Sequence, residues 1–167
     1  MSLSVHLSIH VLLAFLAGFI VSNITQKYLI SFIFALLSGV GIDLDHFIDY
    51  FFAFGWHFKL SEFLSGAQFL KSDKIYILLH GWEYVIILIL AFLLLKNRTA
   101  RPILLALTLG LVFHLGADSV LNEGMKPSSY SIIYRFKNNF DSRRLVTPDH
   151  WQKQLINKKN LKLNGGI

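Results

Sequence analysis

The sequence predicts an all-α fold: an integral membrane bundle of four transmembrane helices, followed by a basic C-terminal tail. Hydrophobic residues occupy 54% of the 167 positions and charged residues only 16%. The fifteen Phe and only three Pro are typical of apolar helices rather than of a soluble sandwich. Most of the sixteen Lys and Arg lie after residue 95. We therefore expect a membrane domain over 1–122 and a basic, partly amphipathic cytoplasmic tail over 123–167.

The four predicted helices lie at about residues 5–22, 28–53, 75–95 and 102–121. A membrane span needs about 20 residues, and each segment reaches that length only when its polar end is included. We therefore expect the polar ends to lie near the lipid headgroups. Met1–Val5 lacks the positive charge of a signal peptide, so the first helix is expected to be retained.

The C-terminal segment Asn122–Ile167 carries nine Lys or Arg. Its last part, His150–Leu163, could form a basic amphipathic helix on the membrane surface, anchored by Trp151, Leu155 and Ile156. The alternative is a solvated, partly frayed C-terminus. Because no nucleic-acid motif accompanies the basic residues, the charge favours anionic lipid as a partner and argues against nucleic acid.

The distribution of positive charge predicts the orientation. With four spans, the N-terminus, the loop after the second span and the tail share one side of the membrane. Six Lys or Arg lie close to the spans on that side, against four on the other. Positive residues favour the cytoplasm, so we expect the shared side to be cytoplasmic.

Each predicted span carries ionisable residues at one end. They are His6 and His10 in the first span, Asp43, Asp45 and His46 in the second, His80 and Glu83 in the third, and His114 and Asp118 in the fourth. Odd and even spans run in opposite directions, so all four clusters are expected at one face of the bundle. Spacings of three or four residues direct each cluster to one side of its helix. The simpler alternatives are interfacial histidines and a structural polar network between helices.

The residue types of these clusters favour a metal site. No Lys or Arg lies inside the spans, so buried carboxylates and imidazoles need another cation. With no cysteine in the chain, the ligands must be histidine and carboxylate, which suit zinc, with manganese as the alternative. The predicted ligands are His10, Asp43, His46, His80, His114 and Asp118, with His6 as the alternative in the first helix. Glu83 or Asp45 is predicted to orient or deprotonate a water nucleophile.

The ordered set resembles the bacterial membrane-bound metal-dependent hydrolases of the YdjM/YbcI type. The shared features are a histidine in the first helix, Asp-x-Asp-His ending at His46, His80 at the start of the third helix, and His-x-x-x-Asp from His114 to Asp118. The last motif is also similar to one in zinc-dependent phospholipases C. The resemblance implies an inner-membrane, multi-pass hydrolase and the possibility of zinc-dependent phosphoester chemistry. The family's second third-helix histidine is missing, and Glu83 lies in that region instead.

These observations predict hydrolysis of a membrane-associated ester, small or lipid-linked, with a lipid phosphoester preferred. Arg135, Arg143 and Arg144 are the candidates for holding a phosphate. The rival class is a non-enzymatic protein: an ion or proton transporter, or a scaffold with a structural metal. A transporter needs ionisable groups that reach the far side of the membrane. The apolar halves of all four segments lack charge, which favours an enzyme open to one side.

Overall fold

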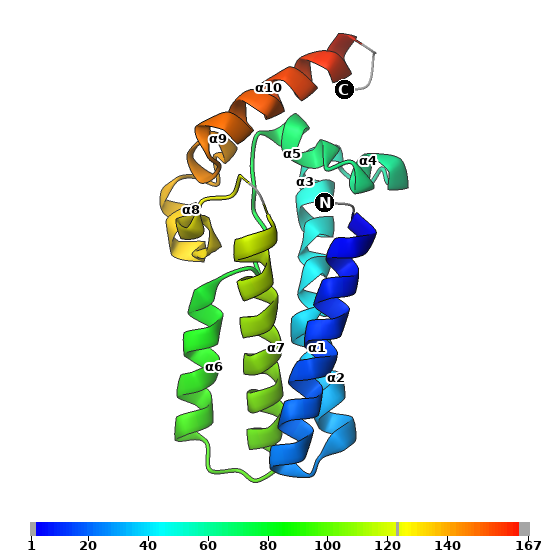
Figure 1. Ribbon diagram of the computed structural model, residues 1–167. Coiled ribbons are helices and arrows are strands. Elements are labelled where there is room, and N and C mark those ends of the chain that lie inside the picture. The colour runs from blue at the N-terminus through cyan, green and yellow to red at the C-terminus, as the bar shows by residue number, and fades with distance from the viewer. Residues whose placement is uncertain (1–2, 123, 164–167) are drawn as a thin grey trace. The chain divides into compact units, whose positions relative to one another are not determined.

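The computed structural model describes residues 3–122 and 124–163, which form helices joined by turns and loops (Figure 1). Within these residues there is no β-strand, only two isolated β-bridges. The all-α prediction is confirmed. The chain divides into two compact units, the first made of Met1–Asp43 and Leu79–Leu121, the second of Leu44–Leu78 and Asn122–Ile167.

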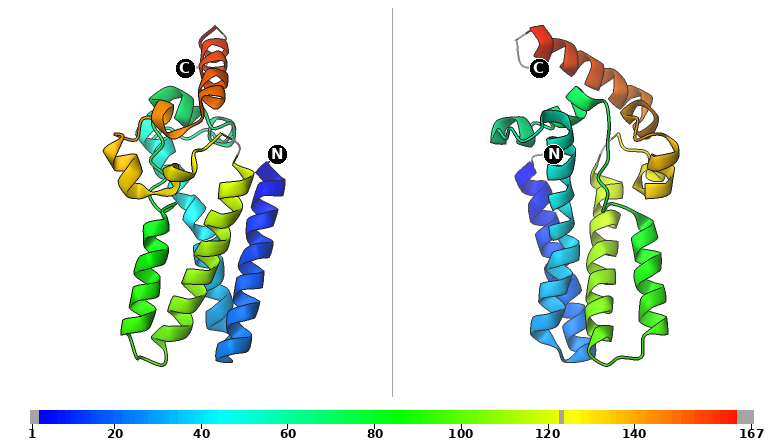
Figure 2. Two further views of the ribbon diagram at one scale, coloured as in Figure 1. Left: turned by 60° about the vertical axis from the view of Figure 1, so that its left-hand side comes forward. Right: turned by 180° about the vertical axis from the view of Figure 1, so that it is seen from behind.

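The first unit is a bundle of four helices. They are α1 (Leu3–Thr25), α2 (Tyr28–Gly39), α6 (Trp82–Leu94) and α7 (Ala100–Leu121). Helices α1, α2 and α7 pack against one another, and α6 packs along α7. Figures 1 and 2 show the α1–α2 and α6–α7 connections at the same end of this bundle. The start of α1 and the end of α7 therefore lie together at the opposite end.

Small residues allow the backbones of α2 and α7 to approach closely. A Cβ atom at Gly110 would lie 2.3 Å from the Ser38 hydroxyl and 2.6 Å from the Ala35 carbonyl oxygen. Ala35 and Ala106 are fully buried in the same contact region. Small residues at helix interfaces are typical of membrane bundles, where packing and interhelical hydrogen bonds, not hydrophobic burial, hold helices together.

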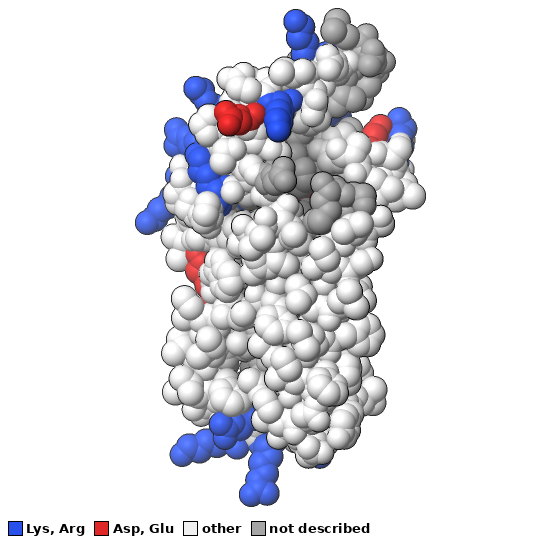
Figure 3. Space-filling model, in the orientation of Figure 1, with Lys and Arg blue, Asp and Glu red and all other residues white. Residues whose placement is uncertain are grey.

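Two helices, α1 over Ser4–Thr25 and α7, are long and apolar enough to cross a membrane. A third span results if Tyr28–Gly39 and Gly41–Phe54 count as one broken span. Helix α6 has 13 residues, fewer than the roughly 20 that a span needs. The predicted number of four spans is therefore not confirmed. On the face seen in Figure 3, the bundle carries few charged side chains between its ends. Lys and Arg gather at the end that holds the α1–α2 and α6–α7 connections (Figures 1 and 3).

The predicted third helix, 75–95, begins only at Trp82 because the residues before it have a different backbone conformation. The backbone N–H groups of Tyr76 and Ile77 both donate to the Asp49 carboxylate, at 2.7 and 2.8 Å. Ile77 has φ of 31°, which an α-helix does not allow. A buried carboxylate thus fixes this segment in a non-helical conformation. The hydrophobic pattern of residues 75–95 cannot predict this contact, because Asp49 lies outside that segment.

The second unit contains the remaining helices and the expected tail. Its helices are α3 (His46–Phe54), α4 (Leu60–Leu64), α5 (Ala67–Ser72), η2 (Pro127–Tyr130), α8 (Ile132–Lys137), α9 (Ser142–Leu145) and α10 (Pro148–Leu163); η1 (Gly41–Asp45) spans the boundary between the units. Its core is Ile75, Ile77, Leu145 and Val146. Residues 44–78 and the C-terminal residues thus form one unit, which differs from the predicted division after residue 122.

The C-terminal helix corrects one detail of the prediction. A helix is present, α10, but Trp151 packs against the core of the second unit. Trp151 was expected to anchor the helix in lipid. Leu155 and Ile156 remain exposed, at 41% and 60%. The tryptophan is partly buried there because two segments distant in sequence, around Ile75 and Leu145, build a surface that it covers.

Candidate metal centre

Six of the predicted ionisable residues meet inside the first unit. His6 and His10 come from the first turns of α1, Asp43 follows α2, and His80 precedes α6. His114 and Asp118 come from the last turns of α7. His10, His80, His114 and Asp118 are buried, and the side chains of His6 and Asp43 are each 19% exposed. The convergence of these residues at one end of the bundle, predicted from the alternating direction of the helices, is confirmed.

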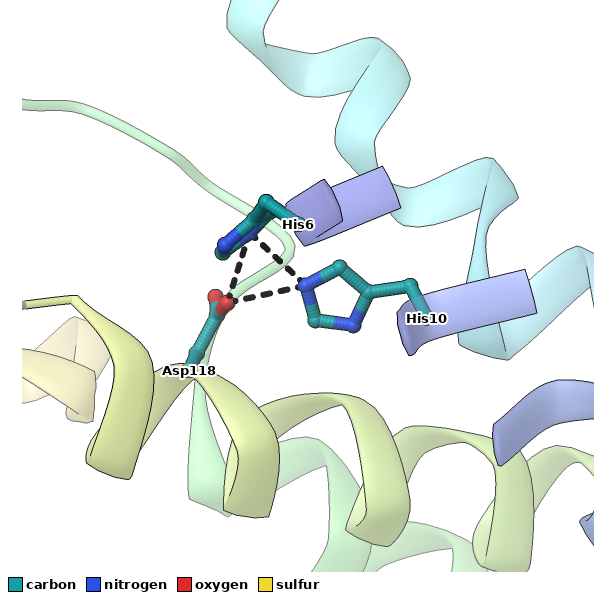
Figure 4. Close-up of side chains that lie close together, drawn as sticks. All are labelled: His6, His10 and Asp118. Carbon is teal, nitrogen blue, oxygen red and sulfur yellow. Dashed lines mark hydrogen bonds and ion pairs between the residues drawn. The ribbon is translucent and has the colours of Figure 1, made fainter. Parts of the chain in front are cut away.

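The first set of donor atoms joins α1 to α7 (Figure 4). The Nε2 atoms of His6 and His10 lie 2.8 Å apart. Each also approaches Oδ1 of Asp118, at 3.3 Å from His6 and 3.1 Å from His10. The three side chains point toward one another. We call these three atoms the α1 set.

The second set lies around the other oxygen of Asp118. The Nε2 atoms of His80 and His114 lie 3.1 Å apart. Oδ2 of Asp118 is 3.7 Å from His80 and 3.5 Å from His114. Oδ1 of Asp43 is 3.3 Å and 3.5 Å from the same two nitrogens. We call these four atoms the α7 set.

The tautomer of His114 follows from its backbone partner. Its Nδ1 lies 2.9 Å from the carbonyl oxygen of Gly39. A carbonyl oxygen only accepts, so Nδ1 carries the hydrogen and donates it. In the neutral imidazole, Nε2 then presents a lone pair to the α7 set. A backbone or carboxylate acceptor on the far nitrogen is the usual support of a metal-binding histidine.

The chemistry of this centre suits a divalent cation. Its donors are imidazole nitrogens and carboxylate oxygens, and several groups of three among them lie close enough together to hold a metal ion. Carboxylates buried in an apolar bundle require a cation or protons. The described parts of α1, α2 and α6 carry no Lys or Arg, and α7 has Arg101 only at its far end. A metal ion is the cation that these residue types fit.

Both first-helix histidines, His6 and His10, contribute a nitrogen to the α1 set, so the geometry does not favour one over the other, and their ligand roles stay predictions. Their spacing of four residues was the signal, because it places both rings on one side of α1. The role of the Gly39 carbonyl as partner of His114 could not be seen in the sequence. It depends on where α2 ends against α7.

The remaining predicted site residues are Glu83, Asp45 and His46. Glu83 lies in the first turn of α6. Its carboxylate lies against the backbone of Gly81, because a Cβ atom added at Gly81 would be 2.9 Å from Oε2 of Glu83. Among the described residues, it belongs to none of the groups that could hold a metal. Asp45 and His46 belong to the second unit, where Asp45 is buried and the His46 ring meets Phe69 edge-on. Their catalytic and ligand roles stay predictions.

The three arginines proposed for phosphate belong to the second unit and differ in environment. Arg135 is fully buried and donates to the carbonyl oxygens of Ser129, at 2.6 Å, and Ile77, at 2.9 Å. Arg143 and Arg144 are exposed on α9. The contacts of Arg135 give it a structural function in joining two segments of this unit. The phosphate role of all three stays a prediction.

Comparisons of the chain with models of known protein families, with curated proteins and with solved structures gave no match. The likeness to membrane-bound metal-dependent hydrolases therefore rests on the ionisable residues and their spacing.

Proposed function

We propose that this protein is a membrane-embedded, metal-dependent hydrolase of the YdjM/YbcI-like kind, acting on a membrane-associated ester. The observation that carries the proposal is the convergence of four imidazole nitrogens and two aspartates at one end of an apolar bundle. The buried carboxylate of Asp118 and the largely enclosed carboxylate of Asp43 are costly among imidazoles unless a cation compensates their charge. The proposed cofactor is zinc, with manganese as the alternative, because the donor set suits both.

The substrate class follows from position and charge. Two of the helices that carry the centre are long and apolar enough to cross a membrane. This supports a lipid or lipid-linked ester as the substrate, since such a molecule would reach the centre without leaving the membrane. A divalent cation, when bound, supplies a nucleophile at neutral pH and neutralises charge on an attacked phosphoryl group. We therefore favour a lipid phosphoester. The exposed Arg143 and Arg144 are the candidates for contacting its phosphate.

The proton of the nucleophile needs a carboxylate that is not itself a ligand. Glu83 fits this role, since it lies three residues after His80 and outside the groups that could hold a metal among the described residues. Asp45 is the alternative. His10, Asp43, His80, His114 and Asp118 are the proposed ligands, joined by His6 and, as predicted from the sequence, by His46.

The proposed location is the bacterial inner membrane, with the site open to the cytoplasm. It is supported by the excess of Lys and Arg expected on that side. His6 and Asp43 are partly exposed, whereas the other members of the centre are buried. Water and substrate would therefore enter beside these two side chains.

One observation favours the rival scaffold function. Structural metal sites are closed, whereas catalytic ones keep an open position, and four of the six residues of this centre are buried. A scaffold would use every carboxylate as a ligand or as a ligand's partner, so that removal of any one of them weakens metal binding.

Replacement of Glu83 separates the two functions. We expect Glu83→Gln, purified in detergent, to keep its fold and metal content and to lose roughly 10²–10⁴-fold in hydrolysis of phospholipid substrates. Asp149→Asn, an exposed carboxylate on α10, is the matched control and should stay active. Loss of metal in Glu83→Gln would show that Glu83 is a ligand. Asp45 would then be the candidate for accepting the proton of the nucleophile. If Glu83→Gln and Asp45→Asn both keep metal and full hydrolysis, neither carboxylate has the proposed proton role. A metal-loaded wild type that hydrolyses no ester would refute the hydrolase proposal and leave the scaffold.

A further inference from the structure

We propose that the centre binds two divalent ions, bridged by the carboxylate of Asp118. This inference rests on the metal centre of the proposed function and adds the number of ions and the residue that joins them. Its basis is that the two oxygens of Asp118 face different histidine pairs. Oδ1 approaches His6 and His10, whereas Oδ2 approaches His80 and His114.

Five of the six distances among the atoms of the α7 set are close to those of a tetrahedral ion site. Bonds of about 2.0–2.2 Å to nitrogen and oxygen place the ligand atoms of a tetrahedral ion about 3.3–3.6 Å apart. The five distances given above for this set run from 3.1 to 3.7 Å. The fixed tautomer of His114 directs its lone pair into the set. His80, His114 and Asp118 thus form a group that could hold one ion. Oδ1 of Asp43, at 3.3 and 3.5 Å from the two histidine nitrogens, is the candidate for a fourth ligand.

The α1 set offers three donors to a second ion. Its distances of 2.8, 3.1 and 3.3 Å suit three neighbouring ligand atoms of one ion. Three protein ligands leave a coordination position open, as in catalytic sites. His6, at 19% side-chain exposure, lies at the accessible side of this set. Because of this open position, we expect the ion of the α1 set to bind the water and the substrate.

The two sets are close enough for paired ions. The rings of His10 and His114, one from each set, stack with centroids 3.9 Å apart. Ions about 3.5–4 Å apart are typical of phosphoesterase sites, where the pair stabilises both the attacking and the leaving oxygen. Two divalent cations carry twice the charge of Asp43 and Asp118, so the centre keeps positive charge for an anionic phosphoester.

A single ion is the competing arrangement. His10, Asp43 and His114 also offer atoms within 4.8 Å of one another, so one ion could lie between the two sets. This arrangement would leave His6 and His80 without a metal. The two arrangements therefore predict different stoichiometries and different effects of removing His6.

The test is metal counting, which does not depend on enzymatic activity. Full-length protein in detergent is saturated with Zn²⁺ or Mn²⁺ and freed of excess ion. We expect two ions per chain in the wild type and one in the His6→Ala/His10→Ala double variant. His57→Ala, which removes an exposed histidine outside the centre, should keep two. Circular dichroism establishes that each variant is folded before its metal content is read.

Electron paramagnetic resonance of the Mn²⁺ form tests the bridge. We expect the hyperfine pattern of an exchange-coupled pair in the wild type, and its loss in Asp118→Asn. Saturation of the wild type at one ion would overturn the proposal, as would two ions with no magnetic coupling. Two coupled ions in a protein that hydrolyses no ester would uphold this inference and refute the proposed function. One ion in a protein that hydrolyses an ester would refute this inference and uphold the proposed function.

Discussion

The Nδ1 atom of His114 lies 2.9 Å from the carbonyl oxygen of Gly39, the last residue of α2. The final carbonyl groups of a helix lack partners within the helix, so this one is available to accept. The contact ties the end of α2 to a proposed metal ligand on α7. It exists only because α2 and α7 lie close together at Gly110, where a Cβ atom would collide with Ser38 and Ala35.

The first prediction concerns this close approach. Gly110→Ala should force α2 away from α7 and lower the free energy of unfolding by about 1–3 kcal/mol, with weaker metal binding because His114 loses its support. Gly116→Ala on the same helix is the control, because a Cβ there meets nothing within 4 Å. It should be neutral or stabilising, by up to about 1 kcal/mol. Thermal unfolding in detergent measures both, and equal effects would show that helix propensity, not packing, is being tested.

The second prediction concerns Asp118, the residue shared by both donor sets. Asp118→Ala should remove most of the bound metal, since each set loses an oxygen. His114→Ala should remove the ion of the α7 set, to which His114 contributes a nitrogen. Elemental analysis of the purified variants checks this, with His57→Ala as control. Full metal content in both variants would refute the ligand assignment.

The third prediction concerns Asp49 and the segment before α6. Asp49→Ala removes the acceptor of the Tyr76 and Ile77 amides. Hydrogen bonds to a charged group contribute about 1.5–3 kcal/mol each, and Ile77 keeps an unfavourable φ without them. We expect faster hydrogen exchange at these two amides and a less stable second unit. Asp149→Asn should leave the exchange rates unchanged, and unchanged rates in Asp49→Ala would contradict the structural role.

The fourth prediction concerns Arg135. Its guanidinium reaches the carbonyls of Ser129 and Ile77 together, which a lysine cannot do with the same geometry. Arg135→Met, which leaves the carbonyls unpaired, should destabilise the protein by about 1–3 kcal/mol or more, and Arg135→Lys by less. Arg143→Lys on exposed α9 is the control. Normal stability with weaker phosphate binding in Arg135→Lys would instead support the phosphate role.

The fifth prediction concerns pH. Burial, with a smaller effect from Lys153, lowers the pKa of His150 below its ordinary value. The unfolded chain, with a histidine pKa of about 6.5, then binds the proton more readily than the folded one. Stability should therefore fall as pH drops through about 6.5 toward the folded pKa. Replacement by Asn should reduce this slope relative to the wild type in unfolding measured between about pH 5 and 8. An unchanged slope would contradict the shift.

Topology gives a last prediction. Reporters inserted in the α1–α2 and α6–α7 connections should report the same side of the membrane, because the two connections lie at one end of the bundle (Figure 1). A reporter after Ile167 should be cytoplasmic if the charge distribution sets the orientation. Opposite signals from the two connections would contradict the bundle, and a periplasmic C-terminus would place the centre on the other side.

The sequence by itself determined the helical class and the composition of the centre. Apolar segments with ionisable residues at alternating ends must bring those residues together once the helices pack antiparallel, so His10, His114 and Asp118 could be predicted to meet. The four-residue spacing of His6 and His10 likewise follows from helix geometry. These features depend on local periodicity and direction, which a sequence records.

Only the tertiary structure decided the rest. It packed the partly buried Trp151 against the core of the second unit, because segments far apart in the chain build the surface that it covers. It delayed the start of the third helix to Trp82, because Asp49 accepts hydrogen bonds from amides 27 and 28 residues away. It also divided the two oxygens of Asp118 between two histidine pairs, a matter of helix rotation and depth. Such relationships are set by contacts between distant segments, and no local pattern of residues encodes them.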